Sequence, residues 1–371
     1  MGVRIWIAGG GTGGHVYPGL AVVQALARAE GTPPEVVYVG GAEGVEARLA
    51  RRAGLRFVGI PAGGVHGLAL RQAARNGWRL ARGWWAAYRL GRRERPDALF
   101  ATGGYASVPV AVAAWSLRVP ILVYLPDVEP GLAVRFISRL ATRVAVTVEE
   151  SQRYFPPRKV VVTGYPVRAE FYGIEKRDAR AALGLNPQEP VLLVMGGSRG
   201  ARSINRAVTA VLEEVLELTQ VVHVSGELDW PWVAERRAAL PERWRGRYHP
   251  SPYLHDEMGH ALAAADLAVC RAGASTLGEL PFFGLPAVLV PYPHAWRYQR
   301  VNARWLTERG AAVTVADDAL AADLLPTVRR LLGERERLAV MAERMRSLAR
   351  PDAGARLAKE LYEIRRSTWY R

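Results

Sequence analysis

The sequence predicts an α/β protein made of two doubly wound domains, each a parallel sheet with helices on both faces. Three observations support this fold class. Short apolar, β-branched runs alternate with longer segments of helical spacing, as in parallel strands joined by helices. The alternation restarts after Gly164, and a glycine-rich turn follows the first strand of each half. The 371 residues also suffice for two domains of ordinary size.

The expected strands divide into two sets. The first set is Val3–Ala8, Val36–Val39, Ala98–Ala101, Ile121–Tyr124, Val144–Val148 and Val160–Thr163. The second set is Val191–Met195, Val221–Val224, Leu267–Cys270, Ala287–Val290 and Ala312–Val315. We therefore expect domains at residues 1–165 and 166–350, with the boundary between residues 164 and 186. A charged helix at residues 351–371 completes the chain, and the sequence does not specify where it docks.

Composition narrows the partners and the compartment. Fifty Lys and Arg against 35 Asp and Glu give a net charge of +15, which indicates an anionic partner: phosphate, nucleic acid or an acidic lipid surface. The single cysteine, Cys270, excludes an internal disulfide and a zinc site built on several thiolates. The N-terminus lacks the features of a signal peptide, so a reducing, cytoplasmic setting is favoured. The uncharged stretch 98–117 is interrupted by Gly103, Gly104 and Pro109, which predicts strand, loop and helix instead of a membrane span.

The first glycine turn, Ala8-Gly-Gly-Gly-Thr-Gly-Gly-His15, lies between a strand and a helical stretch beginning at Pro18. Backbone N–H groups and a helix N-terminus meet there, and such a corner attracts anions. The alternative is a tight turn that only packs strand against helix. Its spacing also fits a dinucleotide site, but Val39-Gly-Gly41 ends the second strand without an acid for the ribose, which disfavours a nicotinamide enzyme.

Two further turns occur in the second half. Met195-Gly-Gly-Ser-Arg-Gly-Ala-Arg-Ser203 opens a helix, and two facing glycine turns suggest a cleft between domains. In Cys270-Arg-Ala-Gly-Ala-Ser-Thr-Leu-Gly-Glu279, Glu279 is a candidate ribose ligand or, alternatively, the acidic member of a Thr276-x-x-Glu279 capping box. The sequence holds no P-loop motif and no Asp-x-Asp pair, so we expect arginine and helix dipoles to neutralise a leaving diphosphate without a metal.

These motifs together resemble the MurG transferases, the N-acetylglucosaminyltransferases that complete lipid II in bacterial cell-wall synthesis. The resemblance rests on the loop Gly10–Ala21 and on Gly103-Gly-Tyr-Ala-Ser107, Pro166-Val-Arg168, Gly196-Gly-Ser-Arg-Gly-Ala-Arg202 and Cys270-Arg-Ala-Gly-Ala274, in order along nearly the whole chain. It implies a GT-B glycosyltransferase fold, with two Rossmann-like domains facing a cleft. The lipid-linked muramyl peptide would bind the first domain and UDP-N-acetylglucosamine mostly the second. It also implies inverting transfer without metal or cofactor, by a peripheral protein on the cytoplasmic face of the cell membrane.

The resemblance further implies binding roles, carried over by matching positions. These are Arg168 and Ser198 at the donor diphosphate, Glu279 at the ribose, Gln299 at the sugar, Leu254 and His255 at the uracil, Ala274 in the third turn, and Thr12, Gly13 and Gly14 on the acceptor side. Three positions depart from the pattern. Tyr124-Leu-Pro-Asp127 stands where the family commonly has His-Glu-Gln-Asn, Tyr165 where Asn is usual, and Tyr298 where the first Gln of a pair is usual. We expect these changes to touch the cleft.

Transfer requires a base, because the attacking hydroxyl must lose its proton. His15 is the leading catalytic candidate, since a helix N-terminus disfavours the imidazolium form. Its alternative role is to bind a diphosphate or the loop backbone. Asp127, where relatives carry an amide, is a competing base.

Residues 66–97 predict a helix that lies on anionic lipid. Six arginines, Arg71, Arg75, Arg79, Arg82, Arg89 and Arg93, occupy an arc of roughly 80° at about 100° per residue, and Trp78 and Trp85 lie beside it. The alternative is a solvated face over a helix packed on the core. Other functions also remain open at this stage: a UDP-sugar-dependent transferase with another lipid acceptor, a nicotinamide oxidoreductase, and a non-catalytic membrane scaffold. Nucleic-acid binding would account for the charge, but no nucleic-acid-binding module is present.

Overall fold

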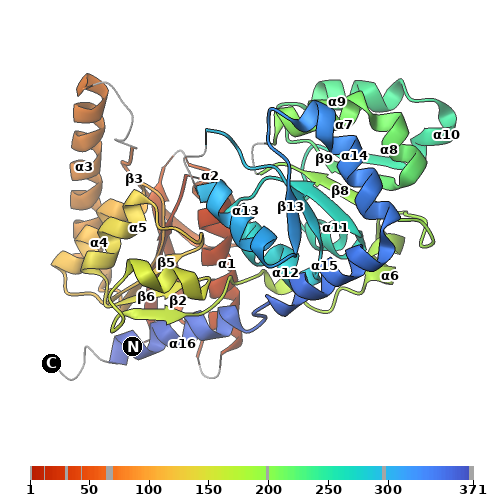
Figure 1. The fold of residues 1–371 in the computed structure, drawn as a ribbon. Coiled ribbons are helices and arrows are strands. Elements are labelled where there is room, and N and C mark those ends of the chain that lie inside the picture. Colours follow the sequence, from red (N-terminus) through yellow and green to blue (C-terminus); the bar gives the residue numbers. More distant parts are fainter. Residues whose placement is uncertain are drawn as a thin grey trace. The chain divides into compact units, whose positions relative to one another are not determined.

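The computed structural model of the chain describes residues 2–11, 13–29, 32–42, 44–63, 70–197, 200–294 and 298–366, and the side chains of these residues except 70–76 and 366. The chain forms two compact units (Figure 1). The first combines Met1–Ala169 with Arg350–Arg371, and the second is Glu170–Ala349. The C-terminal segment, whose docking the sequence left open, thus belongs to the first unit.

The first unit contains a seven-stranded parallel sheet with the order β3-β2-β1-β4-β5-β6-β7. Its strands are β1 (Arg4–Gly9), β2 (Glu35–Gly41), β3 (Arg56–Ile60), β4 (Ala98–Gly103), β5 (Ile121–Leu125), β6 (Arg143–Val146) and β7 (Val160–Val162). The helices between them are α1 (Gly13–Arg28), α2 (Val45–Arg52), α3 (Leu70–Glu94), α4 (Ser107–Ser116), α5 (Leu132–Leu140) and the 3-10 turn η1 (Glu149–Tyr154). The central strands β1, β4 and β5 are mostly apolar and, except for Arg4, buried, as expected for a sheet covered on both faces.

The second unit contains a six-stranded parallel sheet with the order β10-β9-β8-β11-β12-β13. Its strands are β8 (Val191–Met195), β9 (Gln220–Val224), β10 (Tyr248–Ser251), β11 (Leu267–Cys270), β12 (Ala287–Leu289) and β13 (Ala312–Thr314). Its helices are α6 (Lys176–Ala182), α7 (Arg202–Ala210), α8 (Leu212–Leu218), α9 (Trp230–Ala238), α10 (Glu242–Arg245), α11 (Met258–Ala264), α12 (Glu279–Phe283), α13 (Tyr298–Glu308), α14 (Leu320–Gly333) and α15 (Arg335–Ser347), with 3-10 turns η2 (Ala169–Phe171) and η3 (Ala274–Leu277).

The strand order locates the binding edge of each unit. In both sheets the winding direction reverses after the first strand in the chain, between β1 and β4 and between β8 and β11. Ligands of doubly wound proteins bind outside the carboxyl ends of the strands at such a reversal. The glycine turns after β1 and β8 and the third turn after β11 all lie at these edges.

The C-terminal helix α16 (Ala353–Arg366) packs against α1, and in Figure 1 the blue α16 lies close to the red α1. Leu357, Leu361 and Ile364 repeat at helical spacing and are buried in the core of the first unit. Each contributes about 1.5–3 kcal/mol of burial free energy. Arg143 of β6 adds an ion pair to Glu360 at 2.7 Å.

All of the expected strands are present, with ends shifted by at most two residues. The prediction missed β3 and β10, which are both edge strands. Pro250 lies within β10, which an edge position tolerates because its missing N–H need not join the ladder. Residues 98–117 form β4, a loop and α4, as predicted. Among the described residues, no helix combines the length and apolar character that a membrane span requires.

Candidate functional site

His15 lies at the carboxyl edge of the first sheet, in the first turn of α1. The helix begins at Gly13, so Gly13 and Gly14 form its first turn and not a separate loop. The Thr102 hydroxyl donates a hydrogen bond to the His15 carbonyl. At Gly103, whose φ is +96°, an added Cβ would lie 3.2 Å from His15 Cδ2 and 3.4 Å from Nε2. The imidazole therefore lies against the end of β4, where a larger residue would crowd it.

Electrostatics favour the neutral imidazole. Burial lowers the pKa of His15 below its ordinary value, and the carboxylates of Asp127 and Glu46 oppose this shift. The helix N-terminus acts in the same direction as burial, because its partial positive charge disfavours imidazolium, and α1 has no acidic residue in its first turn to offset it. Asp127, half-buried after β5, is thus close enough to His15 to stabilise a proton there. Both predicted catalytic residues therefore follow strands of the first sheet at its carboxyl edge.

Glu46 of α2 is a residue that the sequence analysis missed. Its side chain is fully buried, and its carboxylate accepts hydrogen bonds from the backbone N–H groups of Gly11 at 3.2 Å and Gly41 at 3.1 Å. A Cβ at Gly10 or Gly44 would come within 2.4 Å of this carboxyl group. The glycines after β1 and before α2 therefore make room for an internal carboxylate. One anion-binding N–H of the first turn is already satisfied by the protein itself.

Arg168 belongs to the first unit, together with the α1 face that it contacts. Its guanidinium lies over the Tyr17 ring at 4.8 Å from the centroid, and the residue is 9% exposed. Next to it, the backbone N–H of Ala169 donates to the Gln24 side chain at 2.7 Å. Tyr17 and Gln24 of α1, to which the sequence analysis gave no separate role, thus hold the segment that carries Arg168.

The departures at Tyr124 and Tyr165 are buried in the first unit. Tyr124 has no exposed surface, and its hydroxyl lies 2.7 Å from the Thr147 hydroxyl and 3.1 Å from the Gly164 carbonyl. Tyr165 is 3% exposed. The Tyr124 side chain packs in the core of the first unit, so the expectation that this change touches the cleft is wrong for Tyr124. Within the segment from Tyr124 to Asp127, it is the charge of Asp127 that raises the pKa of His15.

In the second unit, the glycine turn after β8 closes on itself. Gly200 donates to the Gly197 carbonyl at 2.8 Å, and its φ is +77°. A Cβ at Gly200 would lie 2.4 Å from the Ser225 carbonyl oxygen, so only glycine fits between this turn and the end of β9. The turn leads into α7, whose N-terminus provides a corner suited to phosphate.

Arg271, in the third turn, organises this edge of the second sheet. Its guanidinium donates to the Asp317 carboxylate, to the Ser203 hydroxyl at 2.7 Å and to the Val290 carbonyl at 3.1 Å, and it stacks on Tyr292. Ser203 in turn donates to Asp317 at 2.7 Å. The side chain is 9% exposed. Arg271 therefore ties the first turn of α7 to the ends of β11 and β12, a structural role that its place in the motif did not reveal.

Ala274 and Glu279 follow in the same turn. The proposed capping box is wrong: α12 begins at Glu279 with Gly278 as its N-cap, and the Thr276 hydroxyl donates to the Gly273 carbonyl at 2.6 Å. Glu279 is 9% exposed. Burial and then the charge of Glu279 raise the pKa of Cys270 to about 12, so the single cysteine is a buried thiol beside this carboxylate.

The remaining donor candidates are half-buried at the same edge. The Tyr292 backbone N–H donates to Gln299 Oε1 at 2.8 Å. The oxygen of the Gln299 amide is thus used within the protein, and its nitrogen can donate to a ligand. Leu254 and His255 follow β10, with the His255 ring 4.5 Å from the Tyr253 ring. Thr12 and Ser198 lie outside the described residues.

The predicted basic helix is α3, with Trp78 68% and Trp85 53% exposed. The buried positions on its described part are Gly83, Ala87, Gly91 and Glu94. At about 100° per residue, both tryptophans lie near the centre of the opposite face. Arg79 and Arg82 are exposed as well, while the side chains of Arg71 and Arg75 lie outside the described part. Large aromatic side chains thus occupy a face where a solvated helix carries polar residues.

Two regions of the chain match the two domains of one known protein family. Residues 5–146 match the glycosyltransferase family 28 N-terminal domain, and residues 191–357 match the glycosyltransferase family 28 C-terminal domain. A protein of Roseiflexus sp. (strain RS-1), named UDP-N-acetylglucosamine--N-acetylmuramyl-(pentapeptide) pyrophosphoryl-undecaprenol N-acetylglucosamine transferase, is 45% identical and covers 99% of this chain and 96% of its own length. A protein of Desulforudis audaxviator with the same name is 40% identical over 95% of each chain.

Solved structures agree with these matches. The crystal structure of Acinetobacter baumannii MurG superposes with a TM-score of 0.73 at 26% identity, covering 97% of this chain and 99% of that one. A UDP-GlcNAc 2-epimerase from Neisseria meningitidis superposes with a TM-score of 0.70 at 11% identity, covering 97% and 100%, and shares the fold alone. The GT-B fold, with one Rossmann-like domain in each unit, is thereby confirmed.

Proposed function

The chain belongs to the MurG family of glycosyltransferases, and from this membership we propose that it transfers N-acetylglucosamine from UDP-N-acetylglucosamine to the 4-hydroxyl of a polyprenyl-diphosphate-linked muramyl peptide. The near full-length identity to relatives of that name supports this function. Within the structure, the observation that carries the chemistry is the placement of His15 in the first turn of α1 and of Asp127 after β5, both at the carboxyl edge of the first sheet, where burial lowers the pKa of His15.

His15 acts as the general base. A neutral imidazole at pH 7 accepts the proton of the 4-hydroxyl as that oxygen attacks the anomeric carbon, and the glycosidic bond to UDP breaks. The imidazolium formed in this step is opposed by burial and by the helix N-terminus. Asp127 and Glu46 offset that cost, because both carboxylates raise the pKa of His15. Asp127 then stabilises the protonated base, in the way a carboxylate partner supports a catalytic histidine.

The donor diphosphate is neutralised by the protein without a bound metal. As the family resemblance implies, Arg168 supplies a guanidinium to the diphosphate, and the N-terminus of α7 supplies its dipole. Glu279 accepts hydrogen bonds from the ribose, and the amide nitrogen of Gln299 donates to the sugar. The uracil lies near Leu254 and His255, and Ala274 is a further residue of the donor site.

The face of α3 with Trp78 and Trp85 binds the cytoplasmic surface of the membrane. Tryptophan is favoured at the boundary between headgroups and acyl chains, and the neighbouring arginines attract anionic lipid. Leu132 and Phe136, one turn apart on α5, are also 52% and 41% exposed. Such an arrangement brings the enzyme to an acceptor whose polyprenyl chain stays in the membrane.

A transfer assay tests the proposal. Purified protein, UDP-N-acetylglucosamine and a polyprenyl-diphosphate-muramyl peptide are combined in EDTA, and the formation of the disaccharide is measured. We expect turnover in EDTA at the rate seen with added Mg²⁺. Transfer to diacylglycerol but not to the muramyl lipid would instead assign the chain to another glycolipid synthesis, and loss of turnover in EDTA would contradict neutralisation by protein groups alone.

A further inference from the structure

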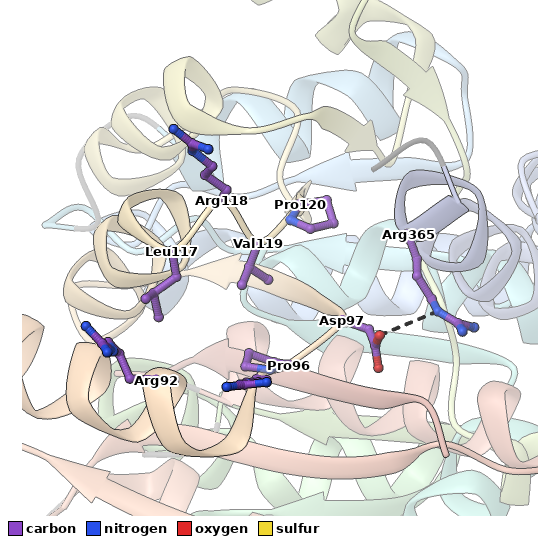
Figure 2. Close-up of a pocket in the computed structure, with 10 residues that line it drawn as sticks. Arg92, Pro96, Asp97, Leu117, Arg118, Val119, Pro120 and Arg365 are labelled. Carbon is purple, nitrogen blue, oxygen red and sulfur yellow. Dashed lines mark ion pairs between the residues drawn. The ribbon is translucent and has the colours of Figure 1, made fainter. Parts of the chain in front are cut away.

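A polar pocket lies in the first unit, at the sheet edge opposite His15 (Figure 2). Its volume is about 580 Å³, within the range of small-molecule sites. Residues that precede β4 and β5, including Asp97 and Pro120, form its floor. Since β4 is six residues long at about 3.3 Å per residue, roughly 17–20 Å of strand separate this pocket from the catalytic edge.

Four arginines line the pocket against one carboxylate. Arg92 comes from the last turn of α3, Arg95 and Arg118 follow the ends of α3 and α4, and Arg365 comes from α16. Asp97 already accepts a hydrogen bond from the Arg4 backbone N–H at 2.7 Å and lies 3.7 Å from Arg365 Nε. Within the described part of the chain, the guanidiniums of Arg92, Arg95 and Arg118 make no hydrogen bond or ion pair. The pocket therefore holds a surplus of positive charge.

Two of these arginines, Arg95 and Arg118, have a left-handed backbone conformation. Arg95 has φ +50° and Arg118 has φ +59°, and within the described residues they are the non-glycine residues with positive φ. Each occupies the position after a helix that glycine takes at least cost, with the Arg95 N–H bonded to the Gly91 carbonyl at 2.8 Å and the Arg118 N–H to Trp115 at 3.0 Å. Both of these strained backbone positions line the same pocket.

We propose that this pocket binds a phosphate-bearing anion. Guanidinium groups match phosphate oxygens with paired hydrogen bonds, and an excess of several positive charges fits a phosphate monoester or a diphosphate better than a single carboxylate. The ligand is either a soluble phosphate compound or the headgroup of an anionic lipid. This site is distinct from the proposed transfer site, because it lies at the opposite edge of the sheet and shares no residue with it.

The test uses R95G/R118G in the full-length protein. Glycine suits both backbone conformations, so the variant removes two guanidiniums without straining the fold. The matched control is R329Q/R330Q, which removes two exposed arginines from α14 of the second unit. Protein saturated with UDP is titrated with inorganic diphosphate by calorimetry, and flotation measures binding to phosphatidylglycerol vesicles. R95Q/R118Q serves as a second variant that keeps a side chain at each position.

We expect at least a tenfold loss of affinity in both pocket variants and not in the control. A loss confined to diphosphate identifies a soluble ligand, and a loss confined to vesicles identifies a lipid headgroup. If neither binding falls more than in the control, the arginines only balance the dipoles of the helix ends and the proposal is overturned. Transfer to a detergent-solubilised acceptor stays within about twofold of wild type in every variant if the pocket is separate from catalysis, so failure of this proposal is distinguishable from failure of the transfer function.

Discussion

Replacing Glu46 with glutamine tests the internal carboxylate that supports the first glycine turn. The carboxylate is fully buried and accepts from Gly11 and Gly41, one backbone N–H on each oxygen. In E46Q only one oxygen remains an acceptor, and the amide NH₂ faces the other N–H. The variant loses one charge-assisted hydrogen bond and leaves one buried donor unsatisfied, which costs about 2–3 kcal/mol of unfolding free energy.

The change also reaches His15. Because the Glu46 carboxylate raises the pKa of His15, its removal lowers that pKa further below the ordinary value. The acid limb of the pH–rate profile then moves to lower pH. Displacement of the turn by a fraction of an ångström lowers turnover at pH 7.5 by roughly tenfold to a hundredfold.

The assay combines urea unfolding with the transfer rate between pH 5 and pH 8. The matched control is E35Q, which removes a carboxylate 47% exposed and 2.6 Å from Arg4; such a surface pair contributes at most about 1 kcal/mol. If E46Q unfolds at the same urea concentration as wild type and keeps its turnover, the carboxylate does not organise this turn.

Four further outcomes are expected. His15→Ala lowers turnover on the lipid acceptor by at least about a hundredfold, as measured at saturating donor; near-normal turnover in this variant would move the base to Asp127. Asp127→Asn shifts the acid limb of kcat/KM to lower pH, because the Asp127 carboxylate raises the pKa of His15 and its removal lowers that pKa. An unshifted limb would exclude coupling between the two residues. W78S/W85S binds anionic vesicles at least about tenfold more weakly in flotation, and equal binding would leave α3 out of the membrane contact. For His223, buried between Tyr248 and Asn205, the pKa is lowered to about 4, so the unfolded state takes up the proton first and urea stability falls by about 2–3 kcal/mol between pH 7 and pH 4.5; H223Q should lack that part of the decline.

The sequence by itself determined the architecture, because strands buried on both faces of a parallel sheet need continuous apolar runs, and such runs are visible in the sequence. The alternation of strands and helices and the glycine turns predicted both doubly wound domains. The sequence analysis did not predict the edge strands β3 and β10, because each buries less apolar surface and carries polar residues or Pro250.

The tertiary structure decided how the site residues are supported. Glu46 is distant in the chain from Gly11, and Arg271 from Asp317, yet each pair is joined by hydrogen bonds. The same holds for α16, whose apolar face could be recognised but whose partner, α1, begins more than three hundred residues earlier. Local pattern records which face of an element is apolar or charged. It does not record which distant backbone group a buried carboxylate satisfies, because that depends on the packing of elements that meet only in the folded chain.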